Sequence, residues 1–190
     1  LAGYEERALE VEMEDLSILL DVDTPADLQR ARRMAAFMDT TTPGVEHASG
    51  PSARALAEED ALQLLTLLRT PDNVLAHCRA VAQVGEAVAA ALHPHLPRLD
   101  VDLVRSACLL HDMVRGQGAR KHALMGERIL RNLGTHRLAD VVGAHMVLPF
   151  EPADASSISE EELVYLADKM VVEDRLAGLA GREQRALERC

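Results

Sequence analysis

Residues 107–112 read Ala-Cys-Leu-Leu-His-Asp, and Met113-Val114-Arg115 follow directly. An apolar helical run therefore ends in two strong metal ligands, His111 and Asp112, with a cation three residues beyond the aspartate. A buried carboxylate without a partner loses most of its hydration, so this pair is costly at the end of a buried helix unless something satisfies it. A divalent ion between the two side chains would do so. The stretch predicts a core helix and a metal site at its end.

The composition around this stretch favours a helical protein. The chain has 190 residues, of which 48% are hydrophobic and only 2% aromatic, and tryptophan is absent. Leucine, alanine and valine dominate, and these side chains suit helices packed through aliphatic surfaces better than a β-sandwich. The length allows a sizeable core. We expect an all-α bundle with one main domain and a small additional piece.

Helical periodicity covers most of the chain from residue 52 onward, with no internal repeat. Each expected helix has an apolar stripe, and several have a capping residue at the first turn. The expected helices span residues 58–69, from Asp72 or Asn73 as cap to residue 92, from the cap Asp100 to His111-Asp112, residues 122–133, residues 138–147, and from the Ser159–Glu162 capping box to Val171.

The first 55 residues differ from the rest. Residues 10–14 alternate with period two and residues 16–20 are apolar, which predicts one or two strands, and Thr24 can cap a helix that starts at Pro25 and runs to about residue 38. Residues 39–51 are rich in Thr, Gly, Ser and Pro, as linkers are. We divide the chain into an amino-terminal piece (1–38), a linker (39–55) and a main domain (56–190). Because the chain opens with Leu1, we expect it to be a piece of a longer protein or a trimmed chain.

The charge pattern argues against nucleic-acid binding, and the cysteine content indicates the type of cellular compartment. The formal net charge is −11, concentrated in residues 1–30, and no basic stripe suits nucleic-acid binding. The three cysteines, Cys78, Cys108 and Cys190, form no CxxC pair, which is typical of a reducing compartment. No apolar run of 18 residues and no signal peptide is visible, so we expect a soluble cytoplasmic protein that does not bind membranes.

Six ligand-type side chains fall on inward helix faces. Each alone has an ordinary explanation, such as a hydrogen-bonded core histidine or an aspartate paired with Lys169 or Arg175. Six in one small domain favour a metal centre, and imidazole with carboxylate suits Fe, Mn, Zn or Co. The six are His77, His111, Asp112, His122, His145 and Asp168. The remaining histidines, which we expect at the surface, are His47, His93, His95 and His136.

The order His77, His111-Asp112, Asp168 on consecutive helices resembles the H…HD…D pattern of the HD-domain metal-dependent phosphohydrolases. Leu109-Leu110 before the pair and Leu166-Ala167 before the last aspartate match as well, and the resemblance covers residues 56–180. It implies the all-α HD-domain bundle. It also implies that metal-activated hydroxide attacks a phosphate ester or anhydride of a small phosphorylated substrate, expected to be a nucleotide.

The resemblance assigns a role to each residue by position. The first ion would be held by His77, His111, Asp112 and Asp168. His122 in KHALMGERIL and His145 in VGAHM match the extra histidines of the dinuclear branches, with Asp112 bridging both ions, so one or two divalent ions remain open. Arg115 would bind a substrate phosphate and act with Asp112 in catalysis. Arg120 and Lys121 are weaker candidates for phosphate, and we expect them in a solvated loop.

The amino-terminal piece carries a second resemblance. Residues 21–28, Asp-Val-Asp-Thr-Pro-Ala-Asp-Leu, resemble the strand-to-helix turn at the carboxyl end of molybdenum-cofactor-type cytidylyl- and guanylyltransferases. The alternative is a generic strand followed by a capped helix. The Gly-rich loop and metal carboxylate of such transferases are absent here, so this piece cannot transfer a nucleotide. A nucleotidyltransferase domain fused in the parent chain is the implied partner.

Alternatives remain for the function. The cyclic-di-GMP phosphodiesterase branch has a GYP loop and a His-His pair where this chain has Ala144-His145-Met146, so that activity is disfavoured, and the dinuclear diadenosine-tetraphosphate hydrolases look closer. The main rival is a non-catalytic, nucleotide-binding regulatory domain of the fused transferase. A helical oligomerisation module with incidental histidines is the third reading. Substrate, native metal and oligomeric state stay open.

Overall fold

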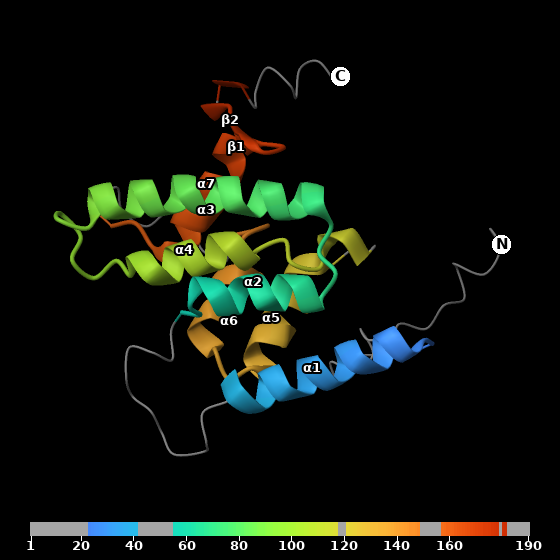
Figure 1. The fold of residues 1–190 in the computed structure, drawn as a ribbon. Helices are drawn as coiled ribbons and strands as arrows, with labels where there is room; N and C mark the ends of the chain where they lie inside the picture. Colours follow the sequence, from blue (N-terminus) through green and yellow to red (C-terminus); the bar gives the residue numbers. More distant parts are fainter. Residues whose placement is uncertain (1–22, 42–54, 118–120, 149–156, 179, 182–190) are drawn as a thin grey trace, which may run out of the picture.

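The computed structural model describes residues 23–41, 55–117, 121–148, 157–178 and 180–181 (Figure 1). Helices dominate these residues, which confirms the predicted all-α fold. None of the described helices is long and apolar enough to cross a membrane. The predicted strands in residues 10–20 and most of the predicted linker lie outside the described residues. The elements are α1 (Pro25–Thr41), α2 (Glu58–Leu67), α3 (Asp72–Leu92), α4 (Val101–Leu110), a 3₁₀ turn (Arg115–Gln117), α5 (His122–Asn132), α6 (His136–Gly143), α7 (Glu160–Met170), β1 (Val171–Val172) and β2 (Arg175–Leu176).

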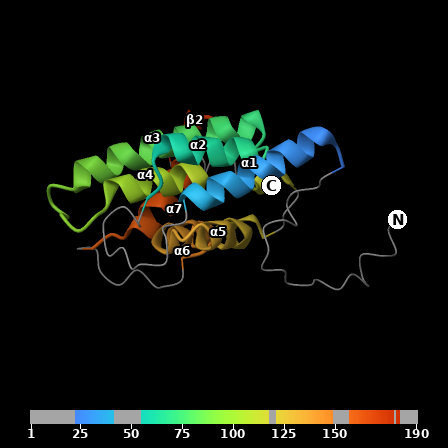
Figure 2. The ribbon, with the colours of Figure 1, turned by 60° about the horizontal axis from the view of Figure 1, so that its bottom comes forward.

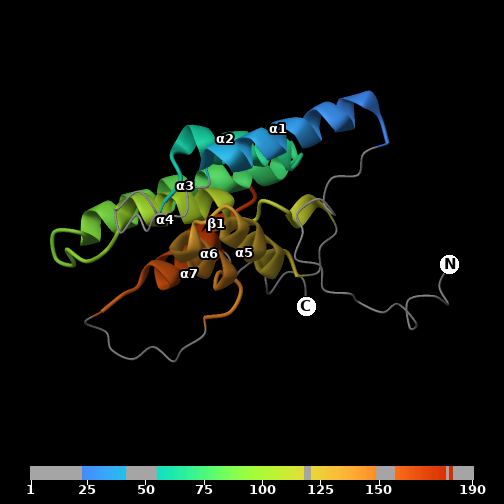
Figure 3. The same ribbon diagram turned by 90° about the horizontal axis from the view of Figure 1, so that it is seen from below.

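Helix α4 is the centre of the bundle. Figures 2 and 3 show α2 and α3 on one side of it and the α5–α6 pair on the other. The predicted cap is confirmed, because the Asp100 side chain accepts a hydrogen bond from the Leu103 N–H at 3.0 Å. Most of α4 is buried, which explains why its sequence is apolar on nearly every face. The His111-Asp112 pair follows this helix directly and is therefore buried in the core.

Helix α3 packs against α4 and α7 along its length. Close approach requires Gly85, since a Cβ atom there would lie 2.5 Å from the Cys108 Sγ. The predicted cap at Asp72 or Asn73 is wrong. Pro71 occupies the N-cap position with extended backbone, and Asp72 is the first helical residue. The negative charge of Asp72 interacts favourably with the positive end of the helix dipole.

The α5–α6 pair closes the other side of α4. Gly126 allows α5 to lie close to α6 and to the residues just after α4, because a Cβ atom there would lie 3.3 Å from both Met113 and Val142. The prediction of a helix over residues 138–147 is wrong at both ends, since α6 spans His136–Gly143. The chain turns after Gly143, where the His145 N–H donates to the Val142 carbonyl at 3.4 Å. Apolar spacing alone does not reveal this end.

Helix α7 begins with the predicted capping box, in which the Ser159 hydroxyl accepts from the Glu162 N–H and the Glu162 carboxylate accepts from the Ser159 N–H. The helix ends at Met170, so the prediction that it includes Val171 is wrong. Val171 instead starts a short antiparallel hairpin in which Val172 pairs with Arg175. Two adjacent β-branched residues favour this extended conformation.

Helix α1 packs against α2 at the edge of the bundle (Figures 1 and 3). Its predicted start is confirmed: the Asp27 N–H donates to the Thr24 hydroxyl at 3.2 Å, and the Asp27 carboxylate accepts from the Thr24 N–H at 3.1 Å. Met34 and Phe37 are buried in the common core. Asp27 also pairs with Arg69 at 2.5 Å, so α1 is attached to the turn that precedes α3.

Candidate metal centre

The six predicted ligand residues come from five helices, and the fold brings them together. His77 lies inside α3 and Asp168 near the end of α7, whereas His122 is the first residue of α5. His111-Asp112 follow α4 directly, and His145 lies in the turn after α6. A cavity of about 740 Å³ opens among them. Its lining includes five of the six, namely His77, Asp112, His122, His145 and Asp168.

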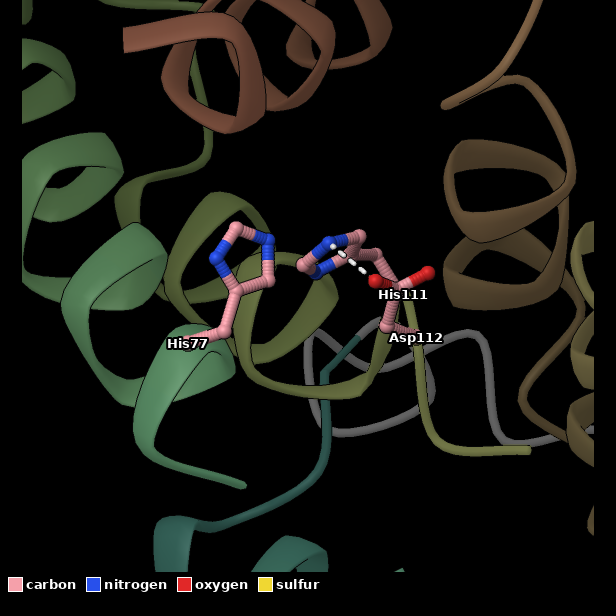
Figure 4. A group of neighbouring side chains, drawn as sticks. All are labelled: His77, His111 and Asp112. Atoms are coloured by element: carbon pink, nitrogen blue, oxygen red, sulfur yellow. Dashed lines mark ion pairs between the residues drawn. The ribbon is translucent and has the colours of Figure 1, made fainter. Parts of the chain in front are cut away.

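The first ligand group consists of His77, His111 and Asp112 (Figure 4), whose donor atoms all lie within 4.8 Å of one another. The His111 Nε2 is 3.5 Å from the Asp112 Oδ2. Asp168 approaches the same group from α7, with its Oδ1 3.1 Å from the His77 Nε2 and 3.6 Å from the His111 Nε2. These are the four residues to which the resemblance to HD-domain proteins assigned the first ion.

The second ligand group consists of Asp112, His122 and His145, again with donor atoms within 4.8 Å of one another. The Asp112 Oδ1 is 3.1 Å from the His122 Nε2 and 3.6 Å from the His145 Nε2. Asp112 therefore directs one oxygen to each group and is shared by both. The imidazoles form a row, with ring centroids 5.3 Å apart for His77–His111, 5.1 Å for His111–His145 and 5.2 Å for His122–His145.

Backbone carbonyls orient three of the four imidazoles. The Nδ1 atom lies 2.8 Å from the Cys108 carbonyl in His111, and 2.6 Å from the Val142 carbonyl in His145. In His77 it lies 2.6 Å from the carbonyl of residue 173. A carbonyl only accepts, so each Nδ1 carries the proton and donates. The Nε2 atoms point to the carboxylates, as in histidines that bind metals.

This donor set fits a divalent metal ion. The His111 Nε2 is buried and has no hydrogen-bond partner among the described residues. The Asp112 Oδ2 lies 3.5 Å and the Asp168 Oδ1 3.6 Å from this nitrogen. A buried ring nitrogen beside two carboxylates is unfavourable unless a metal ion or a proton lies between them. Imidazole nitrogen and carboxylate oxygen together suit transition metals.

Electrostatics keep the two carboxylates and His145 in their metal-binding forms. Burial lowers the pKa of His111, but Cys78 and Asp168 raise it well above its usual value, so a metal ion there would take the place of a proton. Burial raises the pKa of Asp112, but hydrogen bonds with His122 and His145 lower it by more than burial raises it. The resulting pKa is well below the usual range. Burial likewise raises the pKa of Asp168, and contacts with His111 and His77 bring it far below normal. Burial lowers the pKa of His145. Ionised carboxylates and a neutral imidazole are the forms that bind metal.

Two cations line the cavity. The Arg115 Nη1 donates to the Asp112 Oδ2 at 2.5 Å, while its side chain is 57% exposed and so accessible from the cavity. The Lys169 Nζ donates to the Asp168 Oδ2 at 2.5 Å. The sequence predicted Arg115, but treated Lys169 only as an ion-pair partner of Asp168. Of the weaker candidates, Lys121 is exposed at the start of α5 and Arg120 lies outside the described residues.

A comparison with protein families finds that the HD domain model matches residues 74–172, a span that includes all six ligand residues. The chain belongs to the HD domain family. Proteins of this family are generally metal-dependent phosphohydrolases. The chain is also similar to an uncharacterized protein of Methanocaldococcus jannaschii, with 33% identity over 126 residues that cover 60% of this chain and 74% of that protein. No solved structure matches.

Proposed function

We propose that this HD domain is a metal-dependent phosphohydrolase that cleaves a phosphate ester or anhydride, with a nucleotide as the substrate. The observation that supports it most strongly is Asp112, which the two ligand groups share. A carboxylate between two ion sites is the arrangement that dinuclear phosphate hydrolysis needs. The proposed ligands are His77, His111, Asp112 and Asp168 for one ion, and Asp112, His122 and His145 for a second ion of Fe, Mn, Zn or Co.

The protein's own residues supply positioning and charge. When bound, the metal ions would activate water as the nucleophile and offset the charge that develops on the phosphoryl group. Arg115 and Lys169 at the cavity wall each pair with a ligand carboxylate and bring positive charge to the mouth. We propose that Arg115 binds a substrate phosphate, because its guanidinium is exposed and offers several parallel donors.

We propose that residues 1–38 are the carboxyl end of a nucleotidyltransferase-like domain, joined by residues 39–55 to the HD domain at 56–190. The motif Asp-Val-Asp-Thr-Pro-Ala-Asp-Leu and the Thr24-capped start of α1 support this division. The fusion in turn supports a nucleotide, or a nucleotide-linked cofactor intermediate, as the substrate.

Metal content and turnover measured together test the proposal. The full chain, purified without chelator, is analysed for Fe, Mn, Zn and Co, and hydrolysis of p-nitrophenyl phosphate, nucleoside mono- and triphosphates and dinucleoside polyphosphates is then followed. We expect metal in the wild type, turnover of at least one nucleotide, and loss of both in His111→Ala. Arg105→Ala is the control, since Arg105 forms only exposed ion pairs with Glu58 and Asp102. Tight nucleotide binding without turnover would favour the regulatory alternative.

A further inference from the structure

His77 is oriented differently from the two other ligand histidines that donate to carbonyls. His111 and His145 each follow a helix and donate to a carbonyl three residues earlier, in the last helical turn. Carbonyls there have no intrahelical partner, so a nearby imidazole satisfies them. His77 lies inside α3, where the preceding carbonyls accept helical hydrogen bonds. Its acceptor must come from elsewhere, and it is the carbonyl of Glu173, 96 residues further along the chain.

Glu173 has an unusual backbone conformation. Its φ is 59°, and Arg69 is the only other non-glycine residue with positive φ in the described part of the chain. Glu173 is the first residue of the two-residue loop between β1 and β2, since Val172 pairs with Arg175. Glycine is preferred at such a position, because a side chain there is disfavoured sterically. Residues held in this region concentrate at functional sites.

One short segment holds both ring nitrogens of His77. Asp168, near the end of α7, places its Oδ1 3.1 Å from the His77 Nε2. The hairpin then folds back, closed by a hydrogen bond from the Ala177 N–H to the Met170 carbonyl at 2.9 Å, and places the Glu173 carbonyl 2.6 Å from the His77 Nδ1. The hairpin therefore contributes to the metal centre, because it contacts one of the ligand side chains.

We propose that Glu173 is a positioning residue: its left-handed backbone aims its carbonyl at the His77 Nδ1, which fixes the Nδ1–H tautomer and directs the Nε2 lone pair to the metal. The role belongs to the backbone conformation and not to the carboxylate. The inference rests on the metal centre of the proposed function, but not on the identity of the substrate. Partners that orient a ligand in this way are typically worth about 10- to 100-fold in metal affinity.

The test compares substitutions that change the conformation with one that keeps it. Glu173→Val disfavours positive φ, whereas Glu173→Gly removes the carboxylate and keeps positive φ accessible. Asp174→Val is the matched control, because Asp174 is the neighbouring exposed loop residue and has no positive φ. Two readouts are used on the full chain: the tautomer of His77 by ¹⁵N NMR of the metal-free protein, and Mn²⁺ affinity by titration calorimetry.

We expect His77 to be the Nδ1–H tautomer in the wild type, Glu173→Gly and Asp174→Val, with equal Mn²⁺ affinity. Glu173→Val should give a tautomer mixture and bind Mn²⁺ about 10- to 100-fold more weakly. If that variant does not fold, Glu173→Thr, which is also branched at Cβ and so disfavours positive φ, should move both readouts the same way. Wild-type tautomer and affinity in the folded variant, or equal losses in Glu173→Gly, would overturn the inference. If the wild type itself binds no Mn²⁺, the proposed function fails, and the NMR result alone still decides the role of Glu173.

Discussion

The Asp168 Oδ1 lies 3.1 Å from the His77 Nε2, which joins α7 to α3 across 91 residues of sequence. Because the His77 Nδ1 donates to a carbonyl, its Nε2 carries a lone pair and faces an oxygen that is also an acceptor. Such an approach is favourable only with a cation or a proton between the two atoms. A metal ion between the two atoms would make this contact favourable without that proton.

Metal should stabilise the fold. An ion that binds only the native state adds about 2.7 kcal/mol at a concentration of 100 Kd, which corresponds to a rise in Tm of roughly 5–11 °C for a chain of this size. We expect this rise when Mn²⁺ is added to chelator-treated protein, measured by calorimetric melting. His111→Ala should show a much smaller rise. Equal melting temperatures with and without saturating Mn²⁺ would contradict a metal centre here.

The shared position of Asp112 predicts a difference in stoichiometry between variants. Asp112→Asn keeps the size of the side chain but removes the charge that both ligand groups use, so we expect less than one ion per chain. His122→Ala and His145→Ala should each lose only the second ion and keep about one. Elemental analysis of the three variants and the wild type measures this. Equal metal content in Asp112→Asn and His122→Ala would show that Asp112 does not serve both sites.

Loss of the Arg115 side chain should weaken substrate binding. Hydrogen bonds to charged groups contribute about 1.5–3 kcal/mol, so Arg115→Ala should lower kcat/KM by roughly 10- to 150-fold, mainly through KM. Arg115→Lys should recover part of the loss, since it keeps the charge but not the planar fork. Steady-state kinetics on a nucleotide substrate measures the effect, with Arg105→Ala as the control. An unchanged KM in Arg115→Ala would remove Arg115 from substrate binding.

Local signals predicted much of this structure. The caps at Thr24, Asp100 and Ser159 act within three residues, so the sequence shows them directly. Apolar stripes predicted the helices because burial repeats at helical spacing. The order of the ligands along successive helices, from His77 to Asp168, resembles the HD-domain pattern. This resemblance predicted which side chains meet, and the fold brings all six together.

What the sequence did not predict has two physical causes. The end of α6 depends on the turn that His145 makes, and the carbonyl that holds His77 comes from a hairpin 96 residues away. Neither depends on hydrophobic periodicity. The side chain of Glu173 also gives no hint of the role of its backbone, because glycine is the residue that usually marks such a turn.

Arg137 predicts how stability depends on pH. It pairs with Glu160 at 2.8 Å and with Glu161, and so joins α6 to α7. Burial raises the pKa of Glu161, but the contacts with Arg137 bring it below 4.5. The ion pair therefore contributes above pH 4.5, and its contribution is lost as the pH falls through the lower folded-state pKa. Arg137→Ala should cost about 0.5–1 kcal/mol at pH 7, and urea unfolding should show a smaller difference at pH 3. A difference that does not change with pH would contradict this account.

At the crossing of α3 and α4, we expect Gly85→Ala to destabilise the protein when Cys108 is present and to stabilise it when Cys108 is replaced by alanine. A Cβ atom at Gly85 would lie 2.5 Å from the buried Cys108 Sγ, but only in ordinary contact with Ala167 at 3.6 Å. Gly85→Ala alone should therefore destabilise the protein by about 1–3 kcal/mol through overpacking. Once Cys108→Ala has removed the sulfur, the same change should stabilise it by up to about 1 kcal/mol, because alanine is the better helix former. Urea unfolding of the two single variants, the double variant and the wild type, all without metal, completes the cycle. An equal penalty for Gly85→Ala in both backgrounds would show that the sulfur does not set the distance between these helices.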